Sequence, residues 1–160
     1  MSDYKLVIFD LDETLTTTNS GEQFPRNEYD RRPLPGRKRK CRELSKQGVA
    51  KAIATNQGGC AFGYYDPGTL QQAIRNQAYE WFGIERVEMC PHHSQGTVAA
   101  LAQDCHCRKP APGMLLRLMQ WFRALPEETL FVGDMQSDRQ TALTAGCHYQ
   151  AAAEFFGATA

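Results

Sequence analysis

The sequence has no excess of charge of either sign, because 18 Lys and Arg residues are balanced by 18 Asp and Glu residues. Such a chain has no general electrostatic attraction to nucleic acid or to anionic lipid. It also contains no internal repeat, no low-complexity tract and no apolar run long enough to cross a bilayer. These absences exclude a repeat architecture and a bilayer-spanning helix, and we expect no membrane partner.

The chain has little room for a second domain. Its 160 residues, of which 42% are hydrophobic, suffice to bury one core. About forty residues separate Thr14 from Thr55, which is enough for a loop, a helix and a strand. We therefore expect a single domain over residues 1–160 with no separate cap domain. The chain begins with an apolar strand rather than a signal peptide, which predicts a cytoplasmic location.

Paired carboxylates follow two short apolar runs near the ends of the chain. Residues 4–9 and 130–132 each predict a short buried strand. The acidic residues that follow these strands are Asp10, Asp12, Asp134 and Asp138. The carboxyl ends of parallel strands form the ligand crevice of an α/β sheet, so we expect the four carboxylates to converge there. Converging carboxylates repel one another unless a cation lies between them, and Mg²⁺ is the hard divalent ion that suits them. Asp is also common in turns after strands, but that explains one such residue better than four.

Four short motifs occur in a characteristic order. They are D-x-D-x-T from Asp10 to Thr14, a Thr at the end of the next predicted strand at Thr55, a Lys at Lys109, and G-D-x-x-x-D from Gly133 to Asp138. This order resembles that of the haloacid dehalogenase-like (HAD) superfamily of phosphotransferases, subfamily IIIA. The resemblance implies a Rossmann-like α/β core whose parallel sheet carries helices on both faces. Many members have Gly where this chain has Glu13, and other members have Glu.

The chemistry of phosphoryl transfer suggests a role for each of these side chains. A carboxylate attacks phosphorus and forms an aspartyl phosphate when a metal ion offsets the negative charges. The resemblance implies that Asp10 is this nucleophile and that Asp12 is the general acid and base. The transferring phosphoryl group also needs fixed donors, for which we expect Thr55, Asn56 and Lys109.

The expected magnesium ligands come from both acidic pairs. We expect Mg²⁺ to bind Asp10, the main-chain carbonyl of Asp12, and Asp134. Asp138 is expected to support this site or to orient Lys109.

Cysteine and histidine residues form a second cluster of candidate ligands. Cys90-Pro91-His92-His93 is followed, after a short loop, by Cys105-His106-Cys107. Three thiolates and one imidazole complete a tetrahedral zinc site with no open position, which is typical of structural zinc. We assign Cys90, His92, Cys105 and Cys107 as ligands and residues 90–107 as a zinc loop. His93 and His106 remain alternative nitrogen ligands, and a disulfide is less favoured because cytoplasmic thiols are kept reduced.

Residues around this loop narrow the resemblance. The pattern is similar to that of D-glycero-D-manno-heptose bisphosphate phosphatases in three places: Cys-Pro-His-His, Cys-Arg-Lys-Pro and the run Pro112 to Leu115. Histidinol-phosphate phosphatases share part of this pattern. The resemblance implies that Arg108 contacts substrate. Those bisphosphatases carry an Arg shortly after Thr-Asn-Gln, whereas this chain has none in residues 58–63. Residues 16–25, with Asp30 beyond them, are instead similar to the loop that follows the nucleophile in polynucleotide 3'-phosphatases.

A local run of basic residues follows that loop. Its members are Arg31, Arg32, Arg37, Lys38, Arg39, Lys40 and Arg42. A solvated helix face is the favoured interpretation, since charge runs are usually wet surface. If the run faces the crevice, it would instead guide a polyanion toward Asp10.

Three functional hypotheses follow. The first is a monomeric Mg²⁺-dependent phosphatase acting on a small phosphorylated metabolite of the sugar bisphosphate or histidinol-phosphate type. The second is the same chemistry on a DNA or RNA 3'-phosphate end. The third, a non-catalytic zinc-stabilised binding module, is disfavoured because such a module has no need of Asp10, Lys109 and Asp134 together.

Overall fold

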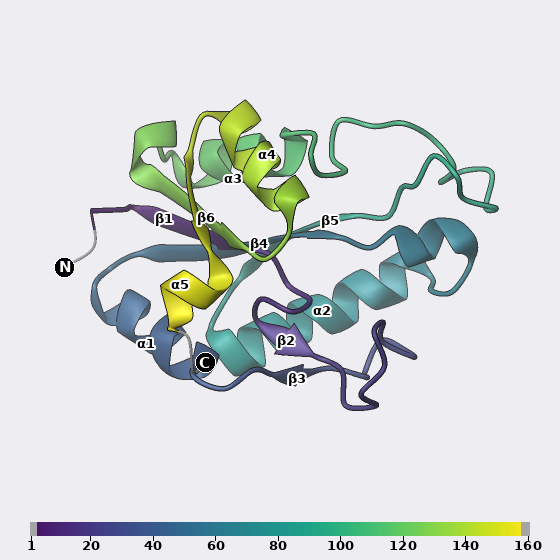
Figure 1. Ribbon diagram of the computed structural model, residues 1–160, viewed down its shortest axis with the longest axis horizontal. Helices are drawn as coiled ribbons and strands as arrows, with labels where there is room; N and C mark the ends of the chain where they lie inside the picture. The colour runs from purple at the N-terminus through teal and green to yellow at the C-terminus, as the bar shows by residue number, and fades with distance from the viewer. Residues whose placement is uncertain (1–2, 158–160) are drawn as a thin grey trace.

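A five-stranded parallel sheet forms the centre of the computed structural model, which describes residues 3–157 (Figure 1). Its strands lie in the order β5-β4-β1-β6-β7. Their bounds are β1 Leu6–Phe9, β4 Ala50–Asn56, β5 Arg86–Cys90, β6 Thr129–Gly133 and β7 His148–Ala151. Phe9, the last residue of β1, pairs with Ile53 on one side and Val132 on the other. The carboxyl ends of β4, β1 and β6 therefore meet at one edge of the sheet.

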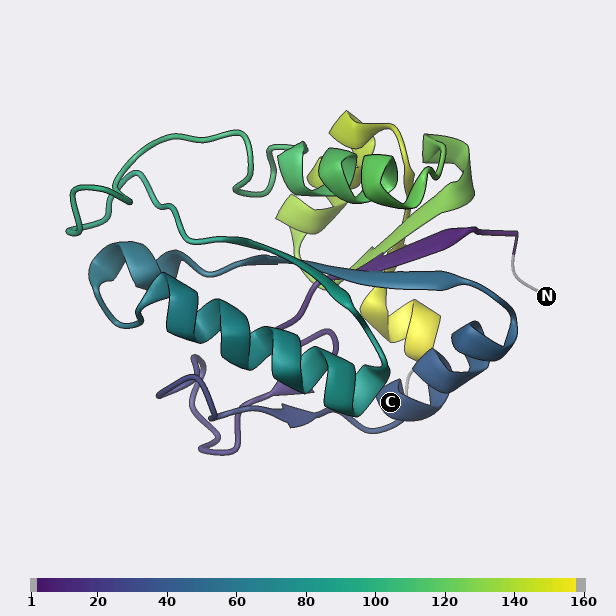
Figure 2. The ribbon, with the colours of Figure 1, turned by 180° about the vertical axis from the view of Figure 1, so that it is seen from behind.

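Helices cover both faces of this sheet, as the front and back views show (Figures 1 and 2). One face carries α1 (Arg37–Lys46), α2 (Pro67–Phe82) and α5 (Ala152–Phe156), and the other carries α3 (Gly113–Phe122) and α4 (Gln136–Ala145). Successive side chains of β1 are buried on opposite faces, so Val7 joins one core and Ile8 the other. The predicted α/β class is confirmed, and residues 3–157 contain no separate cap domain.

Short elements complete the layers. They are the two-stranded ribbon of β2 (Thr16–Thr17) and β3 (Arg32–Pro33), and the 3₁₀ helices η1 (Gly58–Phe62) and η2 (Pro126–Glu128). Among the helices within residues 3–157, none is both long and apolar enough to pass through a bilayer.

The ends of α2 follow from its capping residues. Asp66 precedes the helix, and its carboxylate accepts the main-chain N–H of Thr69 at 2.9 Å, while Pro67 occupies the first turn. Gly83 ends the helix at a φ of 64°. The apolar spacing within this segment begins at Leu70, so the capping residues place the start of α2 three residues before it.

The segment after α4 forms a strand and a short helix, β7 and α5. The polar strand β7 lies at the edge of the sheet. In α5, the rings of Phe155 and Phe156 lie 5.7 and 5.9 Å from the ring of Phe9. The segment from residue 151 to 157 therefore docks on the core, while residues 1–2 and 158–160 of the expected single domain lie outside the described residues.

The loop between β2 and β3, residues 18–31, forms a flap beside the carboxyl edge of the sheet. Asp30 organises it, because its carboxylate accepts the N–H and hydroxyl of Ser20 at 2.8 and 2.6 Å and the N–H of Arg26 at 2.8 Å. These hydrogen bonds lower the pKa of Asp30 to about 2. The flap is tied to the segment after η1 by the Tyr65 hydroxyl, which donates to the Pro25 carbonyl. It is thus an ordered wall rather than a loose loop.

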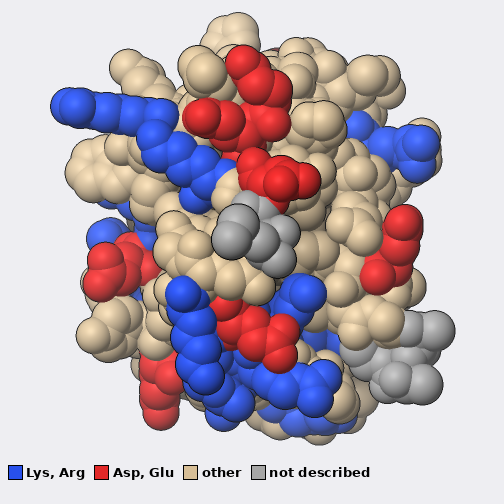
Figure 3. Space-filling view, turned by 90° about the vertical axis from the view of Figure 1, so that its left-hand side faces the viewer, with Lys and Arg blue, Asp and Glu red and all other residues tan. Residues whose placement is uncertain are grey.

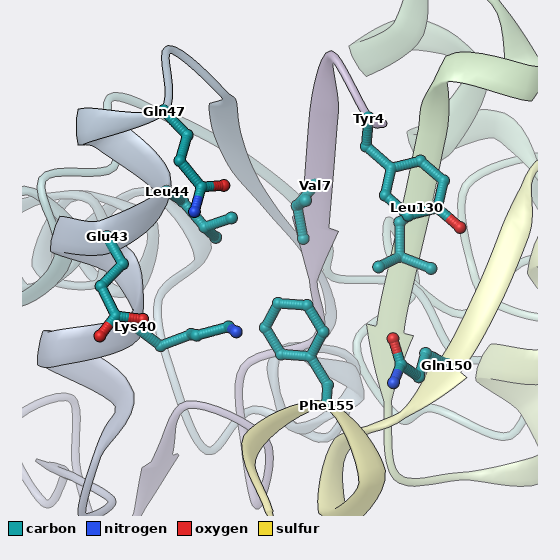
Figure 4. Close-up of a pocket in the computed structure, with 9 residues that line it drawn as sticks. All are labelled: Tyr4, Val7, Lys40, Glu43, Leu44, Gln47, Leu130, Gln150 and Phe155. Atoms are coloured by element: carbon teal, nitrogen blue, oxygen red, sulfur yellow. The ribbon is translucent and has the colours of Figure 1, made fainter. Parts of the chain in front are cut away.

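A cavity of about 280 Å³ opens at the opposite, amino edge of the sheet, between α1 and α5. Val7 and Leu130 form its floor, and Lys40 extends over the ring of Phe155 at its mouth (Figure 4). Because it lies near the start of β1 and β6, it is not part of the crevice that the carboxylates predict.

Gly133 allows β6 to pass close to α4, and we predict that Gly133→Ala destabilises the fold. An added Cβ would lie 2.6 Å from the Cβ and Cγ of the Asp138 side chain, which is held by Lys109 and by the N–H of Met135 and so cannot move away cheaply. We expect a loss of about 1–3 kcal/mol in the free energy of unfolding, measured by urea denaturation. Gly68→Ala is the matched control, because its nearest contact would be an ordinary 3.4 Å. Equal stability of the two variants would contradict the prediction.

Candidate active site and metal centre

The ammonium group of Lys109 lies at the centre of the candidate site. Its Nζ is 2.8 Å from Oδ1 of Asp10, 2.7 Å from Oδ1 of Asp138 and 3.0 Å from the carbonyl oxygen of Ala54. The side chain of Lys109 is only 3% exposed, so these contacts use all three of its donors away from water. Burial alone would lower the pKa of Lys109, but Asp10 and Asp138 keep it above its ordinary value. The site therefore has a fixed positive charge at its base.

The carboxylates around this charge differ in exposure. Asp138 is buried. One of its oxygens accepts from Lys109 and the other accepts the N–H of Met135 at 3.1 Å, so Asp138 fixes the position of Lys109. Asp134 is exposed at the end of β6. The Thr14 hydroxyl lies 3.3 Å from Asp10 Oδ2 and 3.4 Å from Asp134 Oδ1 and bridges them.

This set of acidic residues suits a hard divalent cation. Oxygen atoms of Asp10, Asp134 and Asp138 all lie within 4.8 Å of one another. Burial raises the pKa of Asp10 to about 7 against the opposing effect of Lys109, and the other two carboxylates add to the rise. Three carboxylates facing one ammonium group leave negative charge uncompensated, and oxygen donors are those that Mg²⁺ prefers. The donor set therefore fits the expected magnesium.

The carboxylate of Asp12 is held by a different set of partners. Arg31 donates to it from Nε at 2.8 Å and from Nη2 at 3.2 Å, and Gln57 donates from Nε2 at 2.9 Å. Sequence reasoning missed Arg31 and Gln57 as site residues. Gln57 follows the Thr55 motif directly, which is a usable signal, whereas Arg31 is one of many basic residues in its run.

The predicted phosphate-binding residues are brought to the same edge of the sheet. Thr55 is buried in β4, and its hydroxyl accepts Gln57 Nε2 at 2.9 Å. Asn56 uses its side chain to hold the main chain of Lys109, accepting its N–H at 2.9 Å and donating to its carbonyl at 3.1 Å. Asn56 thus positions Lys109 here, and its direct contact with phosphate stays a prediction.

Arg108 links this site to the zinc loop. Its Nη1 donates to the carbonyl of His92 at 3.3 Å, and it passes over Gly58, where an added Cβ would lie only 2.9 Å from that nitrogen. Together with Lys109, Arg108 lines a cavity of about 180 Å³ that opens beside the loop. Asp10, Asp12 and Asp134 do not line this cavity, so the substrate contact of Arg108 stays a prediction.

The predicted zinc ligands converge in one cluster. The Sγ atoms of Cys90, Cys105 and Cys107 are 2.9–3.6 Å apart, and Nδ1 of His92 is 3.6 Å from Cys90 and 3.3 Å from Cys107. Zinc–sulfur bonds of about 2.3 Å imply tetrahedral edges of about 3.8 Å between thiolates, so the cluster is close to the required size. All three cysteines are free rather than disulfide-bonded. These four residues could hold zinc.

The alternative nitrogen ligands lie outside this cluster. His93 accepts the N–H of Gln95 at its Nδ1, at 3.0 Å, and its ring lies 5.1 Å from that of Phe62. His106 is exposed. The geometry therefore favours His92.

The basic run divides between different environments. Arg31 is buried at Asp12, and Arg37 is buried with its Nε donating to the carbonyl of Thr14 at 2.9 Å. The exposed basic residues of α1 are Lys38, Arg39, Arg42 and Lys46. Figure 3 shows Lys and Arg side chains gathered low on the face at the amino ends of the strands, at the level of α1. This face differs from the carboxyl edge that bears Asp10, so the exposed basic residues of α1 do not line the crevice.

We predict that the purified protein holds about one zinc ion per chain and that His92→Ala loses it whereas His93→Ala retains it. His92 provides the imidazole nitrogen of the cluster, while His93 is engaged with Gln95. Elemental analysis by mass spectrometry measures the ratio. Retention of zinc by His92→Ala, or its loss from His93→Ala alone, would reverse the assignment.

We predict that Asp10→Asn raises the melting temperature in buffer without divalent cations, and more so at about pH 8 than at about pH 5.5. The folded-state pKa of Asp10, about 7, lies above its ordinary 3.8, so folding is increasingly penalised as pH rises between these values. Asn removes that penalty, which we expect to appear as several degrees at the higher pH. Calorimetry at both pH values provides the check, and a pH-independent difference would argue against the raised pKa.

Known proteins resemble this chain in sequence. A D-glycero-beta-D-manno-heptose-1,7-bisphosphate 7-phosphatase from Yersinia pestis is 37% identical over 112 residues, which cover 66% of this chain and 58% of the relative. The chain thus spans less than two thirds of the length of that relative.

Solved structures share the fold over most of the chain. A D,D-heptose 1,7-bisphosphate phosphatase from B. bronchiseptica, complexed with magnesium and phosphate, is 27% identical with a TM-score of 0.72, and the match covers 91% of this chain and 78% of that one. A HAD-like protein from Mesorhizobium loti is 25% identical with a TM-score of 0.78, with 90% of this chain and 69% of that one covered. The predicted HAD resemblance is confirmed.

The sequence model of one family, described as polynucleotide kinase 3 phosphatase, matches residues 5–159 and so includes both acidic pairs, Thr55, Lys109 and the zinc loop. The chain therefore belongs to the polynucleotide kinase 3 phosphatase family.

Proposed function

We propose that this protein is a Mg²⁺-dependent phosphomonoesterase that acts through an aspartyl phosphate on a small phosphorylated metabolite of the sugar bisphosphate or histidinol-phosphate type. The observation that carries the proposal is the convergence of Asp10, Lys109 and Asp134 at the carboxyl edge of the sheet. A non-catalytic zinc-stabilised module would not require a buried ammonium group paired with two carboxylates beside an exposed third, because such groups are costly to bury.

In the first half of the proposed reaction, the carboxylate of Asp10 attacks phosphorus. The bond from phosphorus to the ester oxygen breaks as the bond to Asp10 forms, and Asp12 gives its proton to the departing oxygen. In the second half, Asp12 takes a proton from water, whose oxygen attacks the same phosphorus. The bond to Asp10 then breaks, and inorganic phosphate leaves with Asp10 and Asp12 in their starting states.

Fixed donors support both halves. Lys109 holds one oxygen of Asp10 at 2.8 Å, which orients the nucleophile, and its charge offsets that of the transferring group. Thr55 offers a buried hydroxyl at the end of β4. Mg²⁺ held by Asp10, Asp134 and the main-chain carbonyl of Asp12 would supply positive charge that further offsets the phosphate.

Zinc has a structural part in this proposal. Cys90, His92, Cys105 and Cys107 fill all four positions of a tetrahedral site, which leaves none for substrate. Zinc bound there would stabilise the loop whose next residues are Arg108 and Lys109.

Two observations support the small-metabolite class. The exposed basic residues of α1, which could otherwise bind a polyanion, lie on another face than the carboxyl edge of the sheet. Relatives named as heptose bisphosphate phosphatases match 66% of this chain in sequence and 91% of it in structure. The cytoplasmic location, the monomeric state and the single domain remain predictions.

A second candidate is a polynucleotide 3'-phosphatase. The family match over residues 5–159 favours it, as does the flap segment from Ser20 to Pro25. The chemistry at Asp10 would be the same, and only the leaving group would change.

We predict that the protein releases phosphate from a sugar bisphosphate in the presence of Mg²⁺, and that Asp10→Asn lowers the turnover by about 10³-fold or more because the nucleophile is lost. Phosphate release is measured on heptose bisphosphate, histidinol phosphate, other sugar phosphates and an oligonucleotide with a 3'-phosphate. Asp66→Asn is the matched control, since Asn also caps helices and Asp66 lies at the start of α2.

The panel separates the two candidates. Preference for a small metabolite supports the proposal, whereas preference for the oligonucleotide, with binding that weakens steeply as salt is added, would replace it with the second candidate. Full activity of Asp10→Asn would overturn the mechanism itself.

A further inference from the structure

The flap buries a guanidinium group against the proposed acid–base residue. The side chain of Arg31 is 0% exposed, and its Nε and Nη2 make a two-point ion pair with the two oxygens of Asp12, whose side chain is 35% exposed. Nη2 also donates to Oε1 of Gln57 at 3.3 Å, and Gln57 donates in turn to Asp12. Arg31, Asp12 and Gln57 therefore form a closed triangle of hydrogen bonds.

This arrangement is not one that stability alone favours. Nη1 of Arg31 is buried and has no hydrogen-bond partner among the described residues. A buried donor without a partner destabilises a fold, and a buried ion pair often stabilises a fold no better than apolar residues would. A buried, partly unsatisfied Arg therefore calls for an explanation other than packing.

The hydrogen bonds of the flap indicate that it holds Arg31 in a fixed position. Asp30 fixes the turn immediately before Arg31 through three hydrogen bonds, and Gln77 of α2 holds the carbonyl of Glu28 at 3.0 Å. Arg32, the next residue, pairs with Thr17 in the ribbon and is exposed. The flap is thus braced on both sides of the residue that it directs into the crevice.

We propose that Arg31 is the positioning residue of the acid–base carboxylate. Its planar, two-point contact fixes both the place and the rotation of the Asp12 carboxylate, which a single hydrogen bond from Gln57 cannot do. This inference rests on the proposed phosphatase function and assigns to the flap the task of orienting the group that transfers protons.

Loss of this positioning should affect substrates with poor and good leaving groups differently. An alkyl phosphate needs the proton of Asp12 in the first half-reaction, because an alkoxide is a poor leaving group. p-Nitrophenyl phosphate does not, because nitrophenolate leaves without a proton. Both substrates need Asp12 in the second half, when water is deprotonated. A misplaced Asp12 should therefore slow both halves for an alkyl phosphate but only the second for the aryl phosphate.

We predict that Arg31→Gln lowers kcat for the alkyl phosphate that the wild-type protein prefers by about 10- to 100-fold, with little change in KM. With p-nitrophenyl phosphate, stopped-flow absorbance should show a rapid release of about one equivalent of nitrophenolate per chain, followed by slow turnover. The rapid phase reports transfer to Asp10, and the slow phase reports attack by water.

Three further variants separate positioning from a general loss of structure. Arg32→Gln removes the exposed neighbour and should leave both phases unchanged. Arg31→Lys keeps the charge without the two-point contact and should recover only part of the loss. In the Asp12→Asn background, Arg31→Gln should have no additional effect, because Arg31 acts through Asp12. Melting temperatures of all variants are compared with the wild type.

Four outcomes would overturn the inference. A raised KM with unchanged kcat would make Arg31 a substrate contact, loss of the rapid phase in both Arg31 variants would make it structural, and an additive effect on Asp12→Asn would make it independent. Unchanged kinetics would leave it without a role in an enzyme that works. If wild-type protein fails on every substrate, the proposed function itself falls, and this inference falls with it.

Discussion

The buried ammonium group of Lys109 is the interaction on which the rest of the site depends. It joins four parts of the chain that are distant in sequence: the ends of β1 and β4, the start of α4, and the zinc loop. A buried cation without partners is strongly destabilising, so the loop can carry Lys109 inward only because Asp10 and Asp138 already face it. The same pairing prevents two buried carboxylates from lying side by side unopposed. Chemistry and folding therefore both require the pairing of Lys109 with Asp138, whereas the charge on Asp10 serves the chemistry and lowers stability as pH rises.

Lys109 follows the zinc loop in a segment with little regular structure, so its position depends on restraints other than helix or strand hydrogen bonds. Between β5 and α3 the chain forms turns rather than helices or strands, and its apolar contacts are few. Three kinds of restraint replace them: the Cys and His cluster, the Asn56 side chain that grips the main chain of Lys109, and the main-chain N–H groups of Thr97 and Val98 that bind the Ala61 carbonyl at 2.8 and 2.9 Å. Each acts on a different part of the loop, so their combination fixes its path.

Much of this architecture could be predicted from the sequence, because apolar runs, helix stops and acidic pairs are local signals. The strands that carry Asp10 and Asp134, the helix that ends at Gly83 and the Cys and His cluster are of this kind. The strand β7 could not be predicted, since its residues are polar and only its place at the sheet edge makes it a strand. The pairing of Arg31 with Asp12 is equally invisible in the sequence, because it depends on how the flap folds back rather than on any periodic spacing.

One wall of the crevice contacts the short element η1, and the other contacts the segment directly after it. Arg108 of the zinc-loop side crosses Gly58, where a side chain would collide with its guanidinium group, and Thr97 and Val98 attach to Ala61. The flap reaches the same neighbourhood through Tyr65. Because both walls contact this part of the chain, the ways in which substrate range can diverge during evolution are limited. Residues at the tips of the flap and of the zinc loop can change independently, whereas a change within η1 shifts both walls together, so new specificities are expected to arise at the tips while η1 changes slowly.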